Sequence, residues 1–531
     1  MEKKEKILSA SEIPIKDVYT PEDLRGIDYE KDIGLAGQPP FTRGVYPTMY
    51  RGRAWTIRRL SGFNTPEETN KLYREEYELG QTGFSVAPDI STVVGMDADD
   101  PRVSADIGHA GVPMSSLADV EATFDGLPIE KVSTYLADRC GAVNTAMYFV
   151  MAEKRGLDTR ELRGTTANDL LASSVPSLVN QPPPHAYLRY AVDFIEWCCE
   201  HAPKWNPVSF DSYNARDCGL NAVQELGLLL ATAIQYIEEE KRRGRVPLDA
   251  FVRRCSFNTS VHNDFFEEIA KLRAARRMWY KIIRERYGIK DSRCALFRVH
   301  VQSAGSTHTT QEPLNNLVRI AYQVMAGALG GAQSIHANGY DEGICLPTDQ
   351  AMLLSIRTEQ IAALETNVTN TIDPLGGSYY VESLTNDLEK RTWEYIQRIE
   401  DMGGMVKALD SGWVHKEYKD ATIEHERRLA SGETTVVGVN KFRLEKELYK
   451  VPIFRWDPQS PDKQIEKLKR YKRERDQSKV AQALRRMEEV ARRGENTYPA
   501  VMDAIRAQAT LGEISDVQIG VYGAFRYPLA F

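Results

Sequence analysis

Five polar side chains that could hold a substrate or a cofactor are concentrated between residues 296 and 342: His300, Gln302, His336, Asn338 and Glu342. This stretch reads LFRVHVQSAG, continues through residues with helical periodicity and ends in LGGAQSIHANGYDE. The pattern predicts a strand, a helix and a second strand. In a parallel α/β barrel, side chains at or just past the carboxyl ends of the strands carry out the chemistry. The five residues together therefore indicate an active site, although any one of them could be an ordinary loop residue.

A second group of chemically suggestive residues lies upstream, in TRGVYPTMYRGRAWTIRRLSGF. Here Tyr46, Tyr50 and Trp55 alternate with five arginines: Arg43, Arg51, Arg53, Arg58 and Arg59. Guanidinium groups bind phosphate oxygens in pairs, and an aromatic face suits an adenine ring. The stretch predicts a site for a nucleotide-bearing ligand without a Gly-rich loop. The alternatives are a basic surface loop or a nucleic-acid patch, and the net charge of -7 disfavours the second.

Composition limits the class of protein. Apolar residues make up 42% and charged residues 27% of the 531 residues, which is ordinary for a soluble globular protein. The N-terminus, MEKKEKILSASE, has no apolar signal segment, and no apolar run is long enough to span a membrane. The seven cysteines show no C-x-x-C spacing, so we expect reduced thiols in a cytoplasm and no metal site. We expect neither nucleic-acid nor membrane binding.

Strand and helix patterns alternate along most of the chain. Helices are expected at Leu220–Lys241, Asn263–Tyr287 and Gln350–Glu365, and around Leu317–Leu329. Eight strands are expected between such helices: Gly83–Pro88, Val132–Ala137, Leu162–Thr165, Pro207–Asp211, Arg254–Asn258, Phe297–Gln302, Ala332–His336 and Asn370–Ile372. Eight strands at this spacing predict a (β/α)8 TIM barrel. A doubly wound open sheet would also alternate but would not need eight.

The barrel pattern divides the chain into three parts. Residues 1–60 are predicted to form an N-terminal arm that includes the arginine-rich stretch, residues 61–400 the barrel, and residues 401–531 a helical C-terminal extension. Within the extension, residues 459–495 are rich in Lys, Arg and Glu and indicate a solvated helix or a subunit-contact arm. Several expected strands carry small or polar residues, as in SVAPD, GTTAND and SFNTS. Barrels usually fill their axis with Val, Ile and Leu, so an elongated ligand is expected along this axis.

Long motifs in the chain resemble the large, substrate-binding part of the adenosylcobalamin-dependent acyl-CoA mutases, the methylmalonyl-CoA mutase family. The resemblance runs from about residue 28 to the end and rests on YPTMYRGRAWTIRRLSGF, GQTGFSVAPD, LGGAQSIHANGYDEGICLPT, IDPLGGSYYVE and ATLGEISD. It implies a (β/α)8 barrel with coenzyme A along its axis. It also implies a radical 1,2-rearrangement of the carbon skeleton of an acyl-CoA thioester, with adenosylcobalamin as the cofactor.

The resemblance also implies a partner. The family's cobalamin-binding domain is marked by D-x-H-x-x-G, whose histidine ligates cobalt, and this motif does not occur in the sequence. The chain is therefore similar to the large subunit of a two-subunit mutase, as in isobutyryl-CoA and 2-hydroxyisobutyryl-CoA mutases. We expect a small cobalamin-binding subunit, a heterotetramer of two large and two small subunits, and a GTPase chaperone.

Site residues follow from the matched motifs. The resemblance assigns coenzyme A and acyl contacts to Tyr46, Thr48, Met49, Arg53, Thr56, Arg58, Leu60, Thr165, Ala167, Ser177, Lys204, Arg254 and Ser256. It assigns catalytic positions to Tyr213, Asn214, His300 and Gln302. It assigns contacts with the adenosyl group to Asp217, Gly305, Ser306, Asn338 and Glu342.

The sequence departs from the family pattern where the acyl group would lie. Leu60 replaces a tyrosine, Ala167 a glutamine, Ser177 the arginine that grips a methylmalonyl carboxylate, Asn214 a histidine and Ser306 a tryptophan, and Ala87 stands where the 2-hydroxyisobutyryl branch has Asp. Most of these changes put a shorter or neutral side chain in the pocket, so the cavity should be larger. A methylmalonyl carboxylate would also lose its partner, and a buried carboxylate without a partner is costly. We therefore expect a substrate bulkier than methylmalonyl-CoA, either branched-alkyl, as in pivalyl-CoA, or aryl-substituted, as in benzylmalonyl-CoA.

Several alternatives stay open on the sequence. Arg59 or Arg216 would hold a substrate carboxylate in the aryl case, and the sequence does not choose between them. The chain could instead be an isobutyryl- or 2-hydroxyisobutyryl-CoA mutase, a cobalamin-independent lyase acting on CoA esters, or a catalytically drifted CoA-binding scaffold or regulatory subunit.

Overall fold

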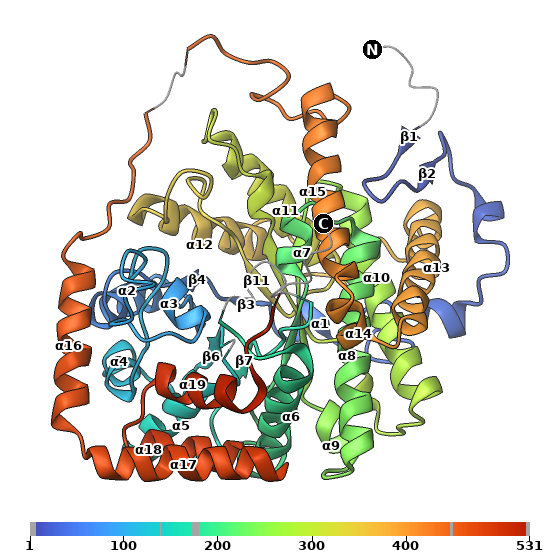
Figure 1. Ribbon diagram of the computed structural model, residues 1–531. Helices are drawn as coiled ribbons and strands as arrows, with labels where there is room; N and C mark the ends of the chain where they lie inside the picture. The colour runs from blue at the N-terminus through green and yellow to red at the C-terminus, as the bar shows by residue number, and fades with distance from the viewer. Residues whose placement is uncertain (1–6, 139, 173–179, 447–449, 527–531) are drawn as a thin grey trace.

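The computed structural model describes residues 7–138, 140–172, 180–446 and 450–526. Its barrel strands lie near the centre of the molecule, among the helices (Figure 1). One five-stranded sheet has the order β3-β11-β10-β9-β8, and one four-stranded sheet the order β4-β5-β6-β7. The strands are β3 (Thr56–Ile57), β4 (Leu60–Ser61), β5 (Gly83–Val86), β6 (Ser133–Leu136), β7 (Gly164–Thr166), β8 (Ser209–Asp211), β9 (Ser256–Val261), β10 (Val299–Ser303) and β11 (Ser334–His336).

Backbone hydrogen bonds close these two sheets into one barrel. β3 and β4 are two halves of a single strand, and they pair with β11 on one side and β5 on the other. Between β7 and β8, the Asn206 amide donates to the Gly164 carbonyl at 2.9 Å, and the Thr166 amide donates to the Asn206 carbonyl at 3.0 Å. The predicted (β/α)8 barrel is confirmed.

Seven of the eight predicted strands are present, and one prediction is wrong. Residues 370–372 form a bend after a helix and pair with no strand. The missing strand is instead residues 56–61, which straddle the predicted division at residue 60 between the N-terminal arm and the barrel. The sequence TIRRLS hides this strand, because two adjacent arginines look like a solvated loop. Their side chains in fact lie on opposite faces of the strand.

Helices surround the barrel and supply the apolar layer that the strands need on their outer faces. The ring consists of α2 (Pro66–Glu78), α5 (Val143–Lys154), α6 (Pro184–His201), α8 (Ala222–Arg243), α10 (Phe265–Lys281), α11 (Asn315–Leu329) and α12 (Asp349–Leu364). Shorter helices precede or follow strands: α1 (Met49–Gly52), α3 (Ile90–Val93), α4 (Leu117–Thr123), α7 (Tyr213–Asp217) and α9 (Leu248–Val252). α13 (Tyr379–Asp401) packs outside α8 and α10.

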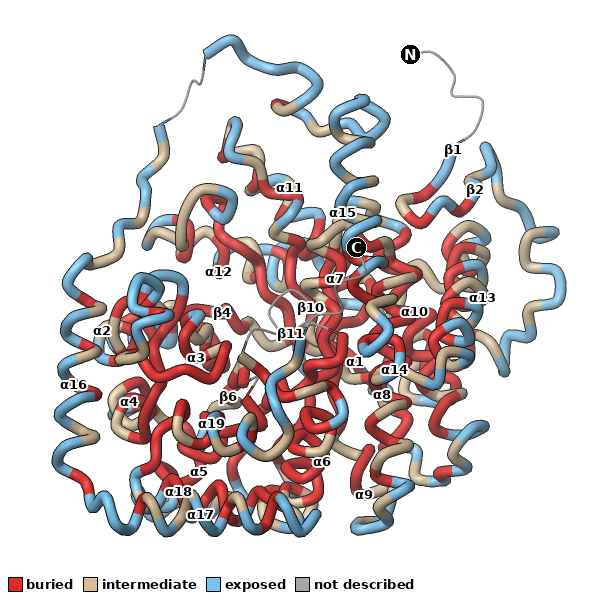
Figure 2. The backbone as a smooth tube through the Cα atoms, viewed as in Figure 1, coloured by how far each residue is buried: buried red, intermediate tan, exposed pale blue. Residues whose placement is uncertain are grey.

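The apolar core lies between the strands and this helical ring, and Figure 2 shows it as the buried part of the molecule. Phe210, Phe257 and Phe297 belong to it, with the rings of Phe257 and Phe297 stacked at 3.9 Å. Their strand neighbours Ser209 and Ser256 face the other way, toward the axis. The barrel is therefore apolar outside and polar inside.

The first and last described segments pack on the outside of the barrel. The N-terminal hairpin of β1 (Ile7–Leu8) and β2 (Pro14–Ile15) is held by Ser11, whose hydroxyl donates to Glu267 at 2.9 Å. After α14 (Met405–Asp410) and α15 (Trp413–Ser431), residues 432–446 and 450–459 are largely exposed and precede α16 (Ser460–Glu474) (Figures 1 and 2). The chain ends in α17 (Gln477–Arg493), α18 (Tyr498–Arg506) and α19 (Leu511–Tyr522), which pack near α5 and α6. Among the described helices, none combines the length and apolar character needed to cross a bilayer.

Gly164 is a sensitive point of the ring, because there is no room for a side chain at this position. A Cβ there would lie 2.2 Å from the Trp205 ring and 2.5 Å from the Thr134 carbonyl oxygen. We expect Gly164→Ala to lower the free energy of unfolding by about 3 kcal/mol. Denaturant unfolding of the purified chain measures this.

Gly520→Ala is the matched control, since Gly520 lies in α19 with nothing within 4 Å of its Cβ position. This variant should be neutral or more stable by up to about 1 kcal/mol, because alanine favours a helix. Equal stability of the two variants would contradict the close packing at Gly164.

Candidate active site

A cavity of about 910 Å³ enters the barrel from the amino ends of the strands. The first residues of most strands form its wall, and nearly all of them are small or hydroxyl-bearing: Thr56, Ser133, Gly164, Ser209, Ser256, Val299 and Ser334. The room predicted along the axis from the small polar strand residues is therefore present. A long, narrow ligand can enter here and point toward the carboxyl ends of the strands.

Arg58 lies inside this cavity and is 7% exposed. Its guanidinium stacks over the Tyr135 ring at 5.1 Å, and its Nε is buried without a hydrogen-bond partner among the described residues. Burial lowers the pKa of Arg58 to about 10, so the group keeps its charge at neutral pH. A buried cation that lacks a hydrogen-bond partner in a cavity marks a place for an anionic or strongly polar ligand atom.

Other cations line the same cavity toward its mouth: Arg53, Arg163, Lys204, Arg254 and Arg298. Burial lowers the pKa of Arg254, and repulsion from Arg298 and Arg163 adds to this effect. The only ion pair of these five within the described residues is the one between Lys204 and Glu161. Such a concentration of positive charge suits a ligand that carries several phosphate groups.

Ten of the residues assigned to coenzyme A from the sequence line this one cavity: Tyr46, Thr48, Met49, Arg53, Thr56, Arg58, Thr165, Lys204, Arg254 and Ser256. The structure adds Arg163 and Arg298, which sequence reasoning missed. Each lies immediately before a strand, and an arginine at the start of a predicted barrel strand is the sequence feature that could have revealed it.

His300 also lines this cavity, in the amino half of β10, so the expectation that it lies at the carboxyl end is wrong. Its Nδ1 is hydrogen bonded to the Ser334 hydroxyl on β11. Burial holds the pKa of His300 well below its usual range, and Arg58 and His336 lower it further. The imidazole is therefore neutral at physiological pH and acts as a hydrogen-bonding group in the wall.

The other predicted polar residues meet at the opposite, carboxyl end of the barrel. The Gln302 amide donates to Asn338 Oδ1 at 3.0 Å, and Asn338 Nδ2 donates to the Ser303 carbonyl at 2.9 Å. His336 ends β11, where its Nδ1 accepts from the Leu60 amide at 3.4 Å. Burial, with Arg59 adding to it, lowers the pKa of His336 to about 3.

The helix α7 contributes Tyr213, Asn214 and Asp217 to the same end. The Tyr213 hydroxyl accepts from the Gly305 amide at 3.1 Å, and Asp217 Oδ1 accepts from the Ser306 hydroxyl at 2.9 Å. Burial raises the pKa of Tyr213 well above its usual value, and Asp217 and Glu342 add to the rise. Tyr213 is therefore a neutral phenol that can donate or accept but does not ionise.

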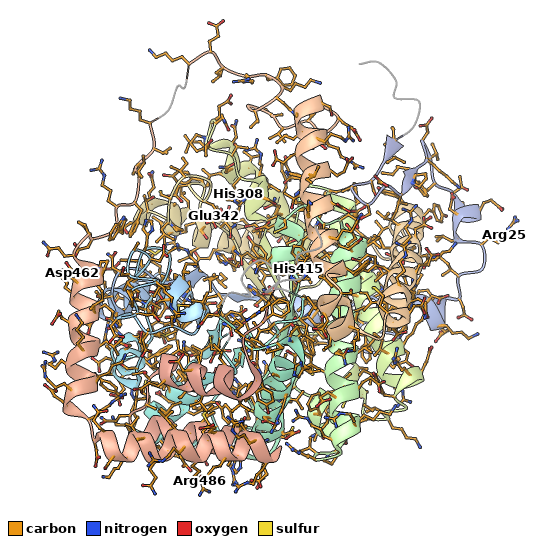
Figure 3. The ribbon with its side chains drawn as sticks, in the orientation of Figure 1. Arg25, His308, Glu342, His415, Asp462 and Arg486 are labelled. Atoms are coloured by element: carbon orange, nitrogen blue, oxygen red, sulfur yellow. The ribbon has the colours of Figure 1, made fainter. Side chains whose placement is uncertain are left out.

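Glu342 lies on the loop after β11, at the same end as His308 (Figure 3). The Glu342 side chain is exposed, but the surrounding protein displaces part of the water around its carboxyl group. This desolvation raises its pKa to about 7, with Asp217 and Asp341 contributing to the rise. The carboxyl end thus presents carboxylates, amides and hydroxyls within one small region.

The described residues that depart from the family pattern lie around this carboxyl end. Leu60 is in β4, Ala167 follows β7 and is buried, and Ala87 follows β5. Ser177 lies outside the described residues, so the structure does not place it.

The two arginines considered as partners for a substrate carboxylate, Arg59 and Arg216, both form ion pairs within the protein. Arg59 Nη1 lies 3.3 Å from Glu76 Oε1 on α2, outside the ring. Arg216 Nη2 lies 3.3 Å from Glu268 Oε1 on α10. All four side chains are buried, so both arginines already have charged partners. Within the described residues, no group of three or more His, Cys, Asp or Glu side chains is placed to share a metal ion.

Comparison with known proteins gives one consistent result. The family model for methylmalonyl-CoA mutase matches residues 8–524. The chain is 37% identical over 527 residues to the 2-hydroxyisobutanoyl-CoA mutase large subunit of Aquincola tertiaricarbonis, covering 99% of this chain and 93% of that one. It is 40% identical over 518 residues to a methylmalonyl-CoA mutase of Cereibacter sphaeroides, covering 97% and 72%. It is 38% identical over 514 residues to the mitochondrial methylmalonyl-CoA mutase of Homo sapiens, covering 96% and 68%.

Proposed function

Because the chain belongs to the methylmalonyl-CoA mutase family of isomerases, we propose that it is the large, substrate-binding subunit of an adenosylcobalamin-dependent acyl-CoA mutase. In this proposal it catalyses the 1,2-rearrangement of an acyl-CoA thioester bulkier than methylmalonyl-CoA. A relative that matches almost from end to end is named a large subunit, which supports a two-subunit enzyme.

The observation that carries the proposal is the division of the barrel into two chemically different ends. The amino end holds the basic cavity with Arg58, Arg254 and Arg298, and the carboxyl end holds the neutral and acidic polar groups around Tyr213 and Asn338. Coenzyme A thioesters have the same division, with phosphates at one end and the acyl group at the other. The cavity orients such a molecule with its acyl group toward the carboxyl end.

The residues at the carboxyl end fit the nucleoside part of adenosylcobalamin. Asp217 and Glu342 supply acceptors for ribose hydroxyls, and the Asn338 amide supplies both a donor and an acceptor. The Gly305 backbone approaches closely, since a Cβ there would lie 3.1 Å from the Tyr213 hydroxyl. When bound, adenosylcobalamin supplies a carbon-centred radical by homolysis of its cobalt–carbon bond.

The chain's own residues bind, orient and shield the substrate. Asn214 donates its amide N–H to the thioester carbonyl but, unlike a histidine, transfers no proton. Tyr213 stays protonated, because burial raises its pKa, and it covers the acyl group against water. Gln302 and Asn338 hold each other in place beside the acyl group.

The proposed partner is a small cobalamin-binding subunit that carries D-x-H-x-x-G, in an assembly of two large and two small subunits that a GTPase chaperone serves. The test mixes both purified subunits with adenosylcobalamin and a panel of acyl-CoA esters, and follows isomerisation by chromatography. An isomeric acyl-CoA as the product supports the proposal. No isomer from any ester, with both subunits folded and cobalamin bound, contradicts it.

Arg58→Ala should weaken the binding of every acyl-CoA by a similar factor. Arg58 is proposed to meet a part of the ligand that all substrates share, and a charge-assisted hydrogen bond contributes about 1.5–3 kcal/mol. The dissociation constant, measured by calorimetry with the chain alone, should rise by about 10- to 150-fold.

Arg51→Ala is the control, because Arg51 is exposed and does not line the cavity. Its dissociation constant should stay within about twofold of the unmodified chain. An affinity loss in Arg58→Ala that is confined to one acyl group would contradict the assignment.

A further inference from the structure

Arg216 is a buried charge on α7, the five-residue helix that also carries Tyr213, Asn214 and Asp217. Its Nη1 donates to the Leu220 carbonyl at 2.9 Å, and its Nη2 lies 3.3 Å from Glu268 Oε1. Its side chain therefore extends away from the barrel axis, into the layer between α8 and α10. The proposed chemistry does not use this arginine.

Arg216 belongs to a cluster of four buried charges, here called the α7 anchor: Arg216, Glu225, Glu268 and Lys271. Lys271 Nζ lies 2.7 Å from Glu225 Oε2 and 2.5 Å from Glu268 Oε2. Glu225 also accepts from the Ser260 amide of β9 at 3.0 Å. Two cations and two carboxylates balance, and the cluster joins α7, α8, α10 and β9.

A helix as short as α7 is not stable by itself, because one turn fixes several residues for very few hydrogen bonds. Ala215 packs in the apolar core, and on the site side Tyr213 meets Gly305 and Asp217 meets Ser306. The site-side contacts are to the loop after β10, which is part of the same site. The α7 anchor adds charged contacts that tie the helix to α8 and α10.

We propose that Arg216 is a positioning residue, which fixes Tyr213 and Asn214 relative to the acyl end of the cavity through the α7 anchor. The inference rests on the proposed function only in taking Tyr213 and Asn214 to face the reacting acyl group. An arginine that the sequence left open as a carboxylate partner thus acts on the substrate through its own helix.

The test separates positioning from stability with one single and one double variant. Arg216→Met leaves two buried carboxylates with only Lys271, so this variant should be less stable. Arg216→Met combined with Glu268→Met leaves the balanced pair of Glu225 and Lys271, and its thermal midpoint should return toward that of the unmodified chain. Neither variant retains the bond between α7 and α10.

In the reconstituted enzyme, we expect kcat to fall at least tenfold in both variants, while KM for acyl-CoA changes less than threefold. Arg277→Met is the control, since Arg277 forms a comparable buried ion pair with Glu389 on α13, away from α7. It should lose stability and keep its kcat. Recovery of kcat together with stability in the double variant, or a rise in KM at constant kcat, overturns the proposal.

Hydrogen exchange of the chain alone gives a result that does not depend on turnover. Amides of residues 213–219 should exchange at least tenfold faster in both Arg216 variants and remain unchanged in Arg277→Met. Unchanged exchange in Arg216→Met overturns the positioning role. If the unmodified enzyme isomerises no acyl-CoA, the proposed function fails, yet the exchange data still decide whether Arg216 holds α7.

Discussion

Incubated with acyl-CoA and adenosylcobalamin but without a partner subunit, this chain is expected to release no isomerised product. The sequence has no D-x-H-x-x-G, the motif that supplies the cobalt-ligating histidine in the family it resembles. Two histidines on the barrel strands are already hydrogen bonded, His300 to the Ser334 hydroxyl and His336 to the Leu60 amide. The residues at the carboxyl end fit only the nucleoside part of adenosylcobalamin. We therefore expect the chain alone to bind the cofactor weakly.

Two measurements check this expectation. Absorption spectra of cobalamin titrated with the chain should stay those of the free cofactor, and turnover should appear only when the small subunit is added. A folded chain is confirmed in the same samples by its binding of acyl-CoA. Tight binding by the single chain, with displacement of the cofactor's own lower ligand, would contradict the expectation.

With both subunits present, we expect methylmalonyl-CoA and succinyl-CoA to be poor substrates. In the family pattern an arginine grips their free carboxylate, and this sequence has Ser177 at that position. Arg59 and Arg216 are held by Glu76 and Glu268. A buried charge without a partner costs about 3 kcal/mol, so kcat/KM should be roughly 100-fold lower than for the best neutral, bulky acyl-CoA.

The same reasoning orders the bulky candidates. Benzylmalonyl-CoA carries a carboxylate as well, whereas pivalyl-CoA does not, so the engaged arginines favour a branched-alkyl substrate. The assay compares methylmalonyl-, isobutyryl-, 2-hydroxyisobutyryl-, pivalyl- and benzylmalonyl-CoA. Isobutyryl and 2-hydroxyisobutyryl esters are included because a relative that acts on 2-hydroxyisobutanoyl-CoA is 37% identical. Methylmalonyl-CoA with the highest kcat/KM would show that the pocket argument is wrong.

A variant tests the size argument separately from the charge argument. Leu60→Tyr restores the aromatic bulk that the family pattern has, and it should shift preference toward smaller acyl groups by about tenfold. Ile361→Tyr adds the same ring on the exposed face of α12 and should leave selectivity unchanged.

The barrel could be predicted from the sequence because strand and helix periods alternate clearly from residue 83 to residue 336. The first strand could not, since Arg58 faces the axis and Arg59 faces α2, and two consecutive arginines carry no apolar alternation. Ten residues that the motifs grouped together do line one cavity, because a motif preserves the order of contacts along the chain.

The end of the barrel at which a side chain lies was harder to predict. His300 and Gln302 are two residues apart on β10, yet one lines the amino-end cavity and the other meets Asn338 at the carboxyl end. Spacing in the sequence predicts on which face of a strand a side chain lies, but not its position along the barrel axis. The sequence could not place Arg216 for a related reason, because its partner Glu268 is far away in the sequence and only the packing of α7 against α10 brings the two together.

The split first strand has a consequence for how the protein folds while it is being synthesised. The ribosome makes β3 and β4 before any other barrel strand, but β3 pairs with residues 334 and 335 of β11, which are made last of the ring. β4 can pair with β5 early, whereas the open edge of β3 must wait until nearly the whole barrel has been synthesised. Late pairing over so long a chain separation slows folding and leaves a strand edge exposed to aggregation in the meantime. In the nascent chain, closure of the ring is therefore the step at which a chaperone that covers an exposed strand edge would have the most effect.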